Sequence, residues 1–125
     1  MRSLLLATLI ATTMTGAYAQ KTPEPNWVNV GATDDASYSI DKASLKRDGN
    51  MVTVWESISM PKKKITAKVF REYDCKENRQ RILSETIYNK DGDNFSRPIK
   101  DVKCEYVVRE SIGEQLMIYV CKSAP

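Results

Sequence analysis

The chain has 125 residues, of which 42% are apolar, 28% charged and 8% aromatic, a composition typical of one globular domain. It contains no histidine, which excludes the Ser-His-Asp triad, the Cys-His pair and every site built on an imidazole ligand. The formal net charge is only +3, and few aromatic residues stand beside the lysines, so nucleic acid is not an expected partner.

The first 19 residues have the pattern of a secretory signal peptide. Arg2 supplies a positive charge, residues 4–10 are apolar, and Ala17-Tyr18-Ala19 forms an A-x-A cleavage site. The apolar run is shorter than the roughly 20 residues that span a bilayer, so we expect export without a membrane span. Cleavage after residue 19 would leave 106 residues with 18 basic and 16 acidic side chains, a net charge of +2. No cysteine follows the apolar run to carry a lipid, and we expect a periplasmic or extracellular protein.

Short extended segments open the chain after this peptide. Residues 20–26 carry Pro23 and Pro25 among polar residues and predict an extended leader. Residues 27–30 alternate with period two up to Gly31, and a second short strand is expected over residues 37–40. Asp48-Gly49 is typical of a tight turn, and it leads into longer strands.

Three longer strands are predicted to follow one another. Residues 51–60 alternate between an apolar face and a face that holds Trp55, and residues 65–75 alternate again, with only Arg71 breaking the apolar face. Residues 61–64 connect the two as a hairpin. Residues 81–88 form the third strand, whose alternation places Ile82, Thr86 and Tyr88 on one face. Antiparallel neighbours in this order indicate a meander.

A helix is predicted at the C-terminal end. Ser111 and Glu114 have the spacing of a capping box, and apolar residues recur every three or four positions up to Cys121. Such a helix would bury its apolar stripe on the sheet. The predicted fold class is therefore α+β: a single antiparallel, meander-like β-sheet with a C-terminal α-helix packed on it, in one domain over residues 27–125.

Three cysteines, Cys75, Cys104 and Cys121, allow three alternative disulfides. Loop entropy gives each about 3 to 4 kcal/mol, so it does not choose among them. The remaining thiol would be either a reactive or intermolecular group or a small buried side chain, and we favour burial. Without a C-x-x-C pair or a histidine, no metal site is expected.

A basic patch is the first candidate for ligand binding. Lys62, Lys63 and Lys64 lie at the predicted hairpin tip, with Lys68 and Arg71 further along the next strand. The patch would attract acidic ligands such as heparin-like chains, anionic proteins or lipopolysaccharide phosphates. A lysine run at such a tip is more often a solvated turn that prevents edge-to-edge aggregation.

Two further candidates lie on the predicted strands. Glu56 and Glu72 could form a carboxylate pair for acid-base catalysis, although surface charge on a half-solvated sheet explains both more simply. Trp55 would anchor a partner if it lay opposite Val52 and Val54, but burial beneath the helix is the more common fate of such a residue. We expect no catalytic residues and no cofactor.

The order of these signals resembles the surface-adhesin protein E family of Gram-negative bacteria. The resemblance lies in an export signal, an early tryptophan, a Val-x-Trp strand motif, a strand that ends in Asp-Cys, a glycine-containing loop and an S-x-G-E helix that ends in Val-Cys. In this sequence these are Trp27, Val54-Trp55, Tyr73-Asp74-Cys75, Asp91-Gly92, and Ser111 to Cys121.

The resemblance implies a function in binding. It implies an antiparallel sheet with a C-terminal helix and a disulfide between Cys75 and Cys121, with Cys104 additional to the pattern and expected as a free thiol. The family's namesake is a surface adhesin that binds epithelial cells and host proteins such as laminin, vitronectin and plasminogen. We therefore expect an exported, non-enzymatic binding protein whose partner is a host matrix protein or an acidic polymer; the alternative is a periplasmic envelope protein or inhibitor that binds another bacterial protein.

Overall fold

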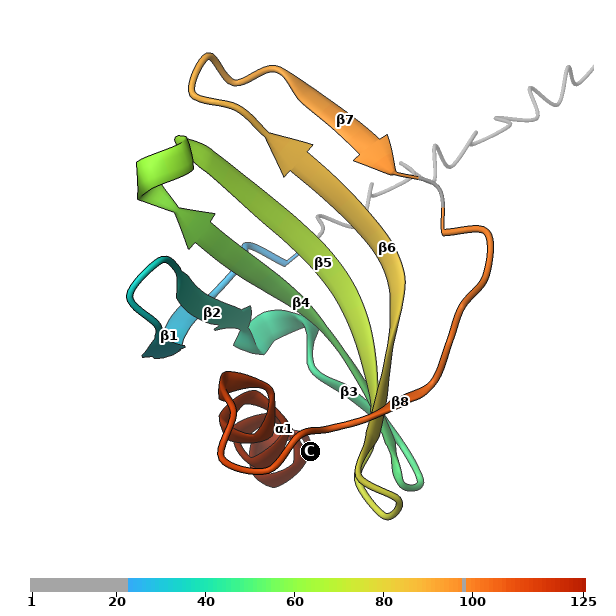
Figure 1. Ribbon diagram of the computed structural model, residues 1–125. Helices are drawn as coiled ribbons and strands as arrows, with labels where there is room; N and C mark the ends of the chain where they lie inside the picture. The colour runs from blue at the N-terminus through green and yellow to red at the C-terminus, as the bar shows by residue number, and fades with distance from the viewer. Residues whose placement is uncertain (1–22, 98) are drawn as a thin grey trace, which may run out of the picture.

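The computed structural model describes residues 23–97 and 99–125, and the predicted signal peptide lies outside the described residues. Eight strands form one antiparallel sheet, followed by a C-terminal helix (Figure 1). The sheet order is β1-β2-β4-β5-β6-β7, with β3 also paired to β4 and β8 to β6. The elements are β1 (Trp27–Ala32), β2 (Ser37–Asp41), β3 (Lys46–Asp48), β4 (Met51–Met60), β5 (Ile65–Asp74), β6 (Arg79–Tyr88), β7 (Asn94–Arg97), β8 (Glu105–Tyr106) and α1 (Ile112–Ser123). The predicted α+β meander is confirmed.

The centre of the sheet is the hairpin of β4 and β5. The two strands pair without a break from Met51 opposite Asp74 to Met60 opposite Ile65. A short 3-10 turn, η2 (Pro61–Lys63), connects them, and Lys64 closes it in the left-handed conformation with φ 54°. Pro61, at the start of η2, has the negative φ angle that a 3-10 turn needs.

The core lies between one face of the sheet and α1, which lies beside that face in Figure 1. The helix contributes three buried residues at three- and four-residue spacing, so they share one side of α1. They pack against apolar side chains that alternate along the strands. The buried cluster consists of Ile40, Val52, Val54, Tyr73, Leu116, Met117 and Val120. We call this side of the sheet the helix face and the other side the open face.

A bulge reverses the alternation of β6. Phe70 is opposite Ser84, but the next residue, Arg71, is opposite Ile82, so Leu83 is an extra residue in β6. Because directly paired residues share a face, Ile82 lies on the helix face with Arg71, whereas Thr86 lies on the open face with Lys68. The prediction that Ile82 and Thr86 share a face is wrong for this reason.

The helix is attached to the sheet near both of its ends. Ser111 caps its start, since the Ser111 Oγ accepts a hydrogen bond from the Glu114 backbone N–H at 3.2 Å, and the predicted helix start is confirmed. At the other end Cys121 forms a disulfide with Cys75, with the two Cα atoms 5.9 Å apart, as the family resemblance implies. A Cβ on Gly31 would lie 2.7 Å from side-chain atoms of Ile112 and Gln115, so glycine lets β1 approach α1 closely and continue beyond its predicted end.

Within the described ranges, no helix has both the length and the apolar character needed to cross a bilayer.

Candidate binding pocket on the open face

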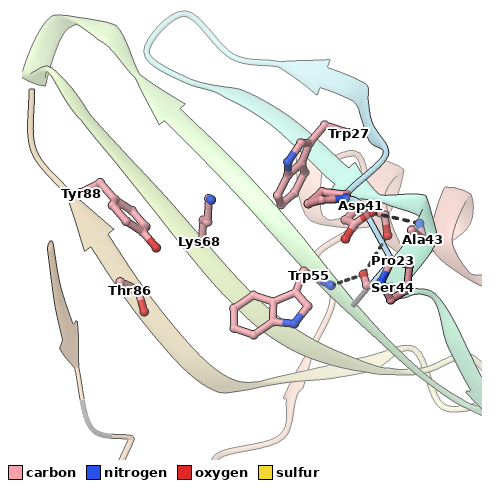
Figure 2. A pocket seen from close by; sticks show the side chains of 10 residues that line it. Pro23, Trp27, Asp41, Ala43, Ser44, Trp55, Lys68, Thr86 and Tyr88 are labelled. Carbon is pink, nitrogen blue, oxygen red and sulfur yellow. Dashed lines mark hydrogen bonds between the residues drawn. The ribbon is translucent and has the colours of Figure 1, made fainter. Parts of the chain in front are cut away.

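A pocket of about 420 Å³ lies on the open face, away from α1 (Figure 2). Its walls come from the leader, β1, the end of β2, β4, β5 and β6. The volume falls in the range of about 300 to 1,000 Å³ typical of small-molecule sites. The side chains that define it are Pro25, Trp27, Trp55, Lys68, Thr86 and Tyr88. We call it the aromatic pocket.

Short side chains in one cross-strand row leave space around Lys68. Lys68 on β5 is opposite Ser57 on β4 and opposite Thr86 on β6. Ser57 is in turn opposite Ser39 on β2. Since paired residues of neighbouring strands share a face, small hydroxyl side chains surround the lysine. The rings of Trp27, Trp55 and Tyr88 form the walls.

The Lys68 ammonium lies between two aromatic rings. Its Nζ is 5.7 Å from the centroid of the Trp27 ring and 5.1 Å from that of Tyr88, both within the range of a cation–π contact. None of the carboxylates in residues 23–97 and 99–125 forms a salt bridge with Lys68. The half-buried charge is therefore oriented by aromatic rings and not neutralised by a described carboxylate.

Trp55 lies on the open face, and the expectation that it is buried beneath the helix is wrong. Its neighbours Val54 and Glu56 are buried on the helix face, so the alternation of β4 directs Trp55 to the other side. Its ring stacks on Phe70 with centroids 5.1 Å apart, which fixes its orientation. Its backbone N–H donates to the Ser44 Oγ at 2.9 Å, in the stretch of β4 between its pairings with β2 and β3. The second tryptophan, Trp27, is 39% exposed.

Asp41 fixes the position of the Trp27 wall. Its Oδ1 accepts a hydrogen bond from the backbone N–H of Asn26 at 2.7 Å and from that of Ala43 at 3.0 Å. The Asn26 carbonyl accepts in turn from the Lys42 N–H at 2.9 Å. The end of the leader is thus bound to the turn after β2, and Trp27 follows directly. In Figure 2, Asp41 and Lys68 lie on opposite sides of the Trp27 ring.

The predicted basic patch is divided by the structure. Lys62, Lys63 and Lys64 are all exposed at the β4–β5 connection, and Lys62 is 3.4 Å from Asp35 in an exposed salt bridge. Lys68 lies in the aromatic pocket. Arg71 lies on the helix face, where its Nε is 2.7 Å from the Glu56 Oε1. Only the three hairpin lysines therefore form a common surface.

Glu56 and Glu72 do not form a carboxylate pair. Glu56 is buried on the helix face, whereas Glu72 lies on the open face, where it accepts a hydrogen bond from the Arg81 Nε at 2.6 Å. The interpretation of Glu56 as surface charge is also wrong, because only 1% of it is exposed and it accepts hydrogen bonds from both Arg71 and the Tyr73 hydroxyl. Burial raises the pKa of Glu56 above its ordinary value, and the Arg71 charge opposes this shift.

Cys104 is a free, exposed cysteine, so the expectation of a buried third thiol is wrong. It lies between β7 and β8, in a stretch that belongs to neither strand. Connecting segments between strands usually run over the protein surface, where their side chains face solvent. Across the described parts of the chain, no group of histidine, cysteine or acidic residues is arranged to hold a metal ion.

The sequence pattern of the surface-adhesin protein E family matches residues 27–122, which is most of the chain. This chain belongs to the surface-adhesin protein E family. The suspected resemblance is thereby confirmed, and the match includes every strand of the sheet, both cysteines of the disulfide and the pocket residues from Trp27 onward. Neither a curated protein nor a solved structure matches the chain.

Sequence reasoning missed the aromatic pocket as a site, although each of its residues carried a signal. Trp55, Lys68 and Trp27 all occupy the polar positions of alternating strands, where a large ring or a cation is free to face solvent. These positions come together in the fold because of the strand order and the bulge in β6, and neither feature is visible in a local sequence pattern. Membership in this adhesin family agrees with the interpretation of the aromatic pocket as a binding site.

Proposed function

We propose that this protein is an exported, non-enzymatic binding protein that contacts ligands of the host extracellular matrix or cell surface. The observation that carries the proposal is the aromatic pocket: both tryptophans of the chain line the same hollow on the open face as Lys68, which has no salt-bridge partner among the described residues. Tryptophan and tyrosine supply large contact areas at low cost in conformational entropy, and they dominate binding sites. Membership in the surface-adhesin protein E family supports the same function.

The arrangement of charged groups favours binding over catalysis. The buried Glu56 is held by Arg71 and Tyr73, so it has no free position beside a substrate. The exposed Cys104 has no imidazole near it, because the chain has no histidine. The pocket itself offers rings, hydroxyls, the Lys68 ammonium and the Asp41 carboxylate, whose Oδ1 is held by two backbone N–H groups.

Surface exposure tests the location that this function requires. Intact cells of the host bacterium are treated with a protease, and the protein is followed by immunoblot. Cleavage on intact cells is the expected result. Protection until the outer membrane is opened would contradict the adhesin function and support a periplasmic protein that binds another bacterial protein.

Binding to immobilised laminin and vitronectin tests the ligand class. The wild-type protein is compared with Trp27→Ala and with a triple Lys62→Glu, Lys63→Glu, Lys64→Glu variant, because these change the two exposed candidate surfaces separately. We expect the Trp27→Ala variant to lose binding and the hairpin variant to retain most of it. The reverse result would move the binding surface to the hairpin lysines, and no binding by the wild type would contradict the proposal.

A further inference from the structure

We propose that the aromatic pocket binds a ring of an acidic saccharide, with the sugar stacked on the tryptophans and its carboxylate or sulfate beside Lys68. This inference rests on the proposed binding function and specifies the chemistry of its ligand. Four properties of the pocket carry it: the main chain around it, the rings, the polar groups at its rim and the charge of Lys68.

The main chain beside Lys68 offers nothing to an extended peptide. A peptide that adds a strand to a sheet needs unpaired N–H and C=O groups along an edge. At Lys68 the strand β5 is paired with β4 on one side and with β6 on the other, and β6 is paired with β7 beyond Thr86. Recognition around Lys68 must therefore come from side chains, which suits a ligand without a peptide backbone.

The rings match the apolar face of a sugar. The orientation of Trp55 is fixed by its stacking on Phe70, and Trp27 and Tyr88 stand on either side of Lys68 (Figure 2). A pyranose ring presents a patch of C–H groups on one face and hydroxyls around its rim. An aromatic ring buries such a patch by the hydrophobic effect and attracts its C–H groups through the negative face of the ring.

Polar groups at the rim can accept and donate to the sugar hydroxyls. The Asp41 Oδ1 is occupied by two backbone N–H groups, but its Oδ2 has no hydrogen-bond partner among the described residues. The Thr86 hydroxyl shares a single 3.1 Å hydrogen bond with the Ser96 hydroxyl, so it retains further capacity. Both residues line the pocket, and each can bind a hydroxyl of the ligand.

The charge of Lys68 selects an acidic ligand. The space between Trp27 and Tyr88 already holds an ammonium group, so a cationic ligand would meet like charge. A carboxylate or sulfate would form a charge-assisted contact with Lys68, and the pocket would exclude part of the water that screens it. Asp41 lies beyond the Trp27 ring, so the hydroxyl groups of the ligand would extend toward Asp41 and its acidic group toward Lys68.

Intrinsic fluorescence tests this inference directly, because the two tryptophans of the chain both line the pocket. The purified protein is titrated with a hyaluronan tetrasaccharide, which alternates glucuronic acid and N-acetylglucosamine, and with chitotetraose, the neutral N-acetylglucosamine tetramer. We expect the acidic saccharide to change the fluorescence and to bind about tenfold more tightly than the neutral one, a difference of about 1.4 kcal/mol. Equal affinities, or no response to either saccharide up to about 10 mM, would overturn the inference.

Matched lysine variants identify the charge that is responsible for the preference for the acidic saccharide. Lys68→Gln is expected to remove the preference for the acidic saccharide, whereas Lys63→Gln, which neutralises an exposed lysine at the hairpin tip, is expected to keep it. Circular dichroism confirms that both variants fold. An equal loss in both variants would show general charge attraction and overturn the inference. If no saccharide binds but laminin or vitronectin does, only this inference fails and the proposed function stands.

Discussion

Two arginines of the sheet form the same kind of cross-strand contact in very different surroundings. Arg71 contacts Glu56 on the helix face with 13% and 1% of the two side chains exposed, and Arg81 contacts Glu72 on the open face with 38% and 14% exposed. An ion pair in water contributes little, because solvent competes for both charges. Removal of one partner from a buried pair leaves a charge without compensation.

The two pairs therefore predict unequal costs for the same substitution. We expect Arg71→Met to lower the free energy of unfolding by about 3 to 5 kcal/mol, because Glu56 would remain buried without its cation. Arg81→Met should cost about 1 kcal/mol or less. Urea unfolding at neutral pH measures the free energy of unfolding of both variants. Equal losses would contradict the assignment of Glu56 to a buried, charge-compensated site.

The raised pKa of Glu56 predicts how the cost of Arg71→Met depends on pH. Because burial raises the native pKa above the ordinary value of 4.5, the native state binds this proton more tightly than the unfolded state. Its contribution is fully present below pH 4.5 and is lost as the pH rises through the native pKa. Arg71 lowers that pKa, so its removal raises the pKa further.

The stability gap between wild type and Arg71→Met should consequently widen as the pH is raised from 4.5 toward neutrality. Urea midpoints at several pH values measure this gap, with Arg81→Met as the control whose gap stays small throughout. A gap of constant size would contradict the role given to Arg71.

At the scale of elements, the sequence predicts those parts whose side chains alternate. β4 and β5 direct every second residue to the helix face, and the Ser111 cap marks the helix start, so local patterns identify all three elements. β7 and β8 were not predicted because all of their residues are exposed, which removes the apolar alternation on which strand prediction depends. The bulge at Leu83 has no local signal either, since it follows from the register of β5 against β6.

The disulfide is the covalent link between two of these elements. Cys75 directly follows β5 and Cys121 lies in the last turn of α1, with a sequence separation of 46 residues. The chain-entropy relation gives about 4 kcal/mol for a loop of that length. We expect the double variant Cys75→Ala, Cys121→Ala to lose stability of this order in denaturant unfolding, with Cys104→Ser as the unaffected control. A loss below about 1 kcal/mol would contradict a role for the bond in fixing α1.

At the scale of the whole molecule, Cys104 is accessible from outside the fold. We expect the native protein to react with a single equivalent of a thiol reagent such as DTNB, and Cys104→Ser to abolish the reaction, because the other two cysteines are joined. Non-reducing electrophoresis should show a monomer. A reducible dimer that disappears in Cys104→Ser would instead assign this thiol to a link between two chains.

The candidate site could be predicted only in its parts. The sequence identified Lys68 as a cation and Trp55 as a residue with two possible faces, but it grouped Lys68 with the hairpin lysines and with Arg71. In the structure Lys68 and Arg71 point to opposite faces of β5, because they are an odd number of residues apart. Trp27 reaches Lys68 across the sheet, a proximity that depends on strand order and on no local spacing.

The Cys75–Cys121 bond also determines how the chain would respond to mechanical load. A force applied between its two ends passes through the covalent bond and bypasses the segment between the cysteines, which contains β6, β7, β8 and nearly all of α1. With 46 residues in that separation, about 160 Å of extended chain is withheld from stretching. Under tension, β6 with the pocket residues Thr86 and Tyr88 would remain inside the closed loop, and the strands from β1 to β5 would be the first to bear the load.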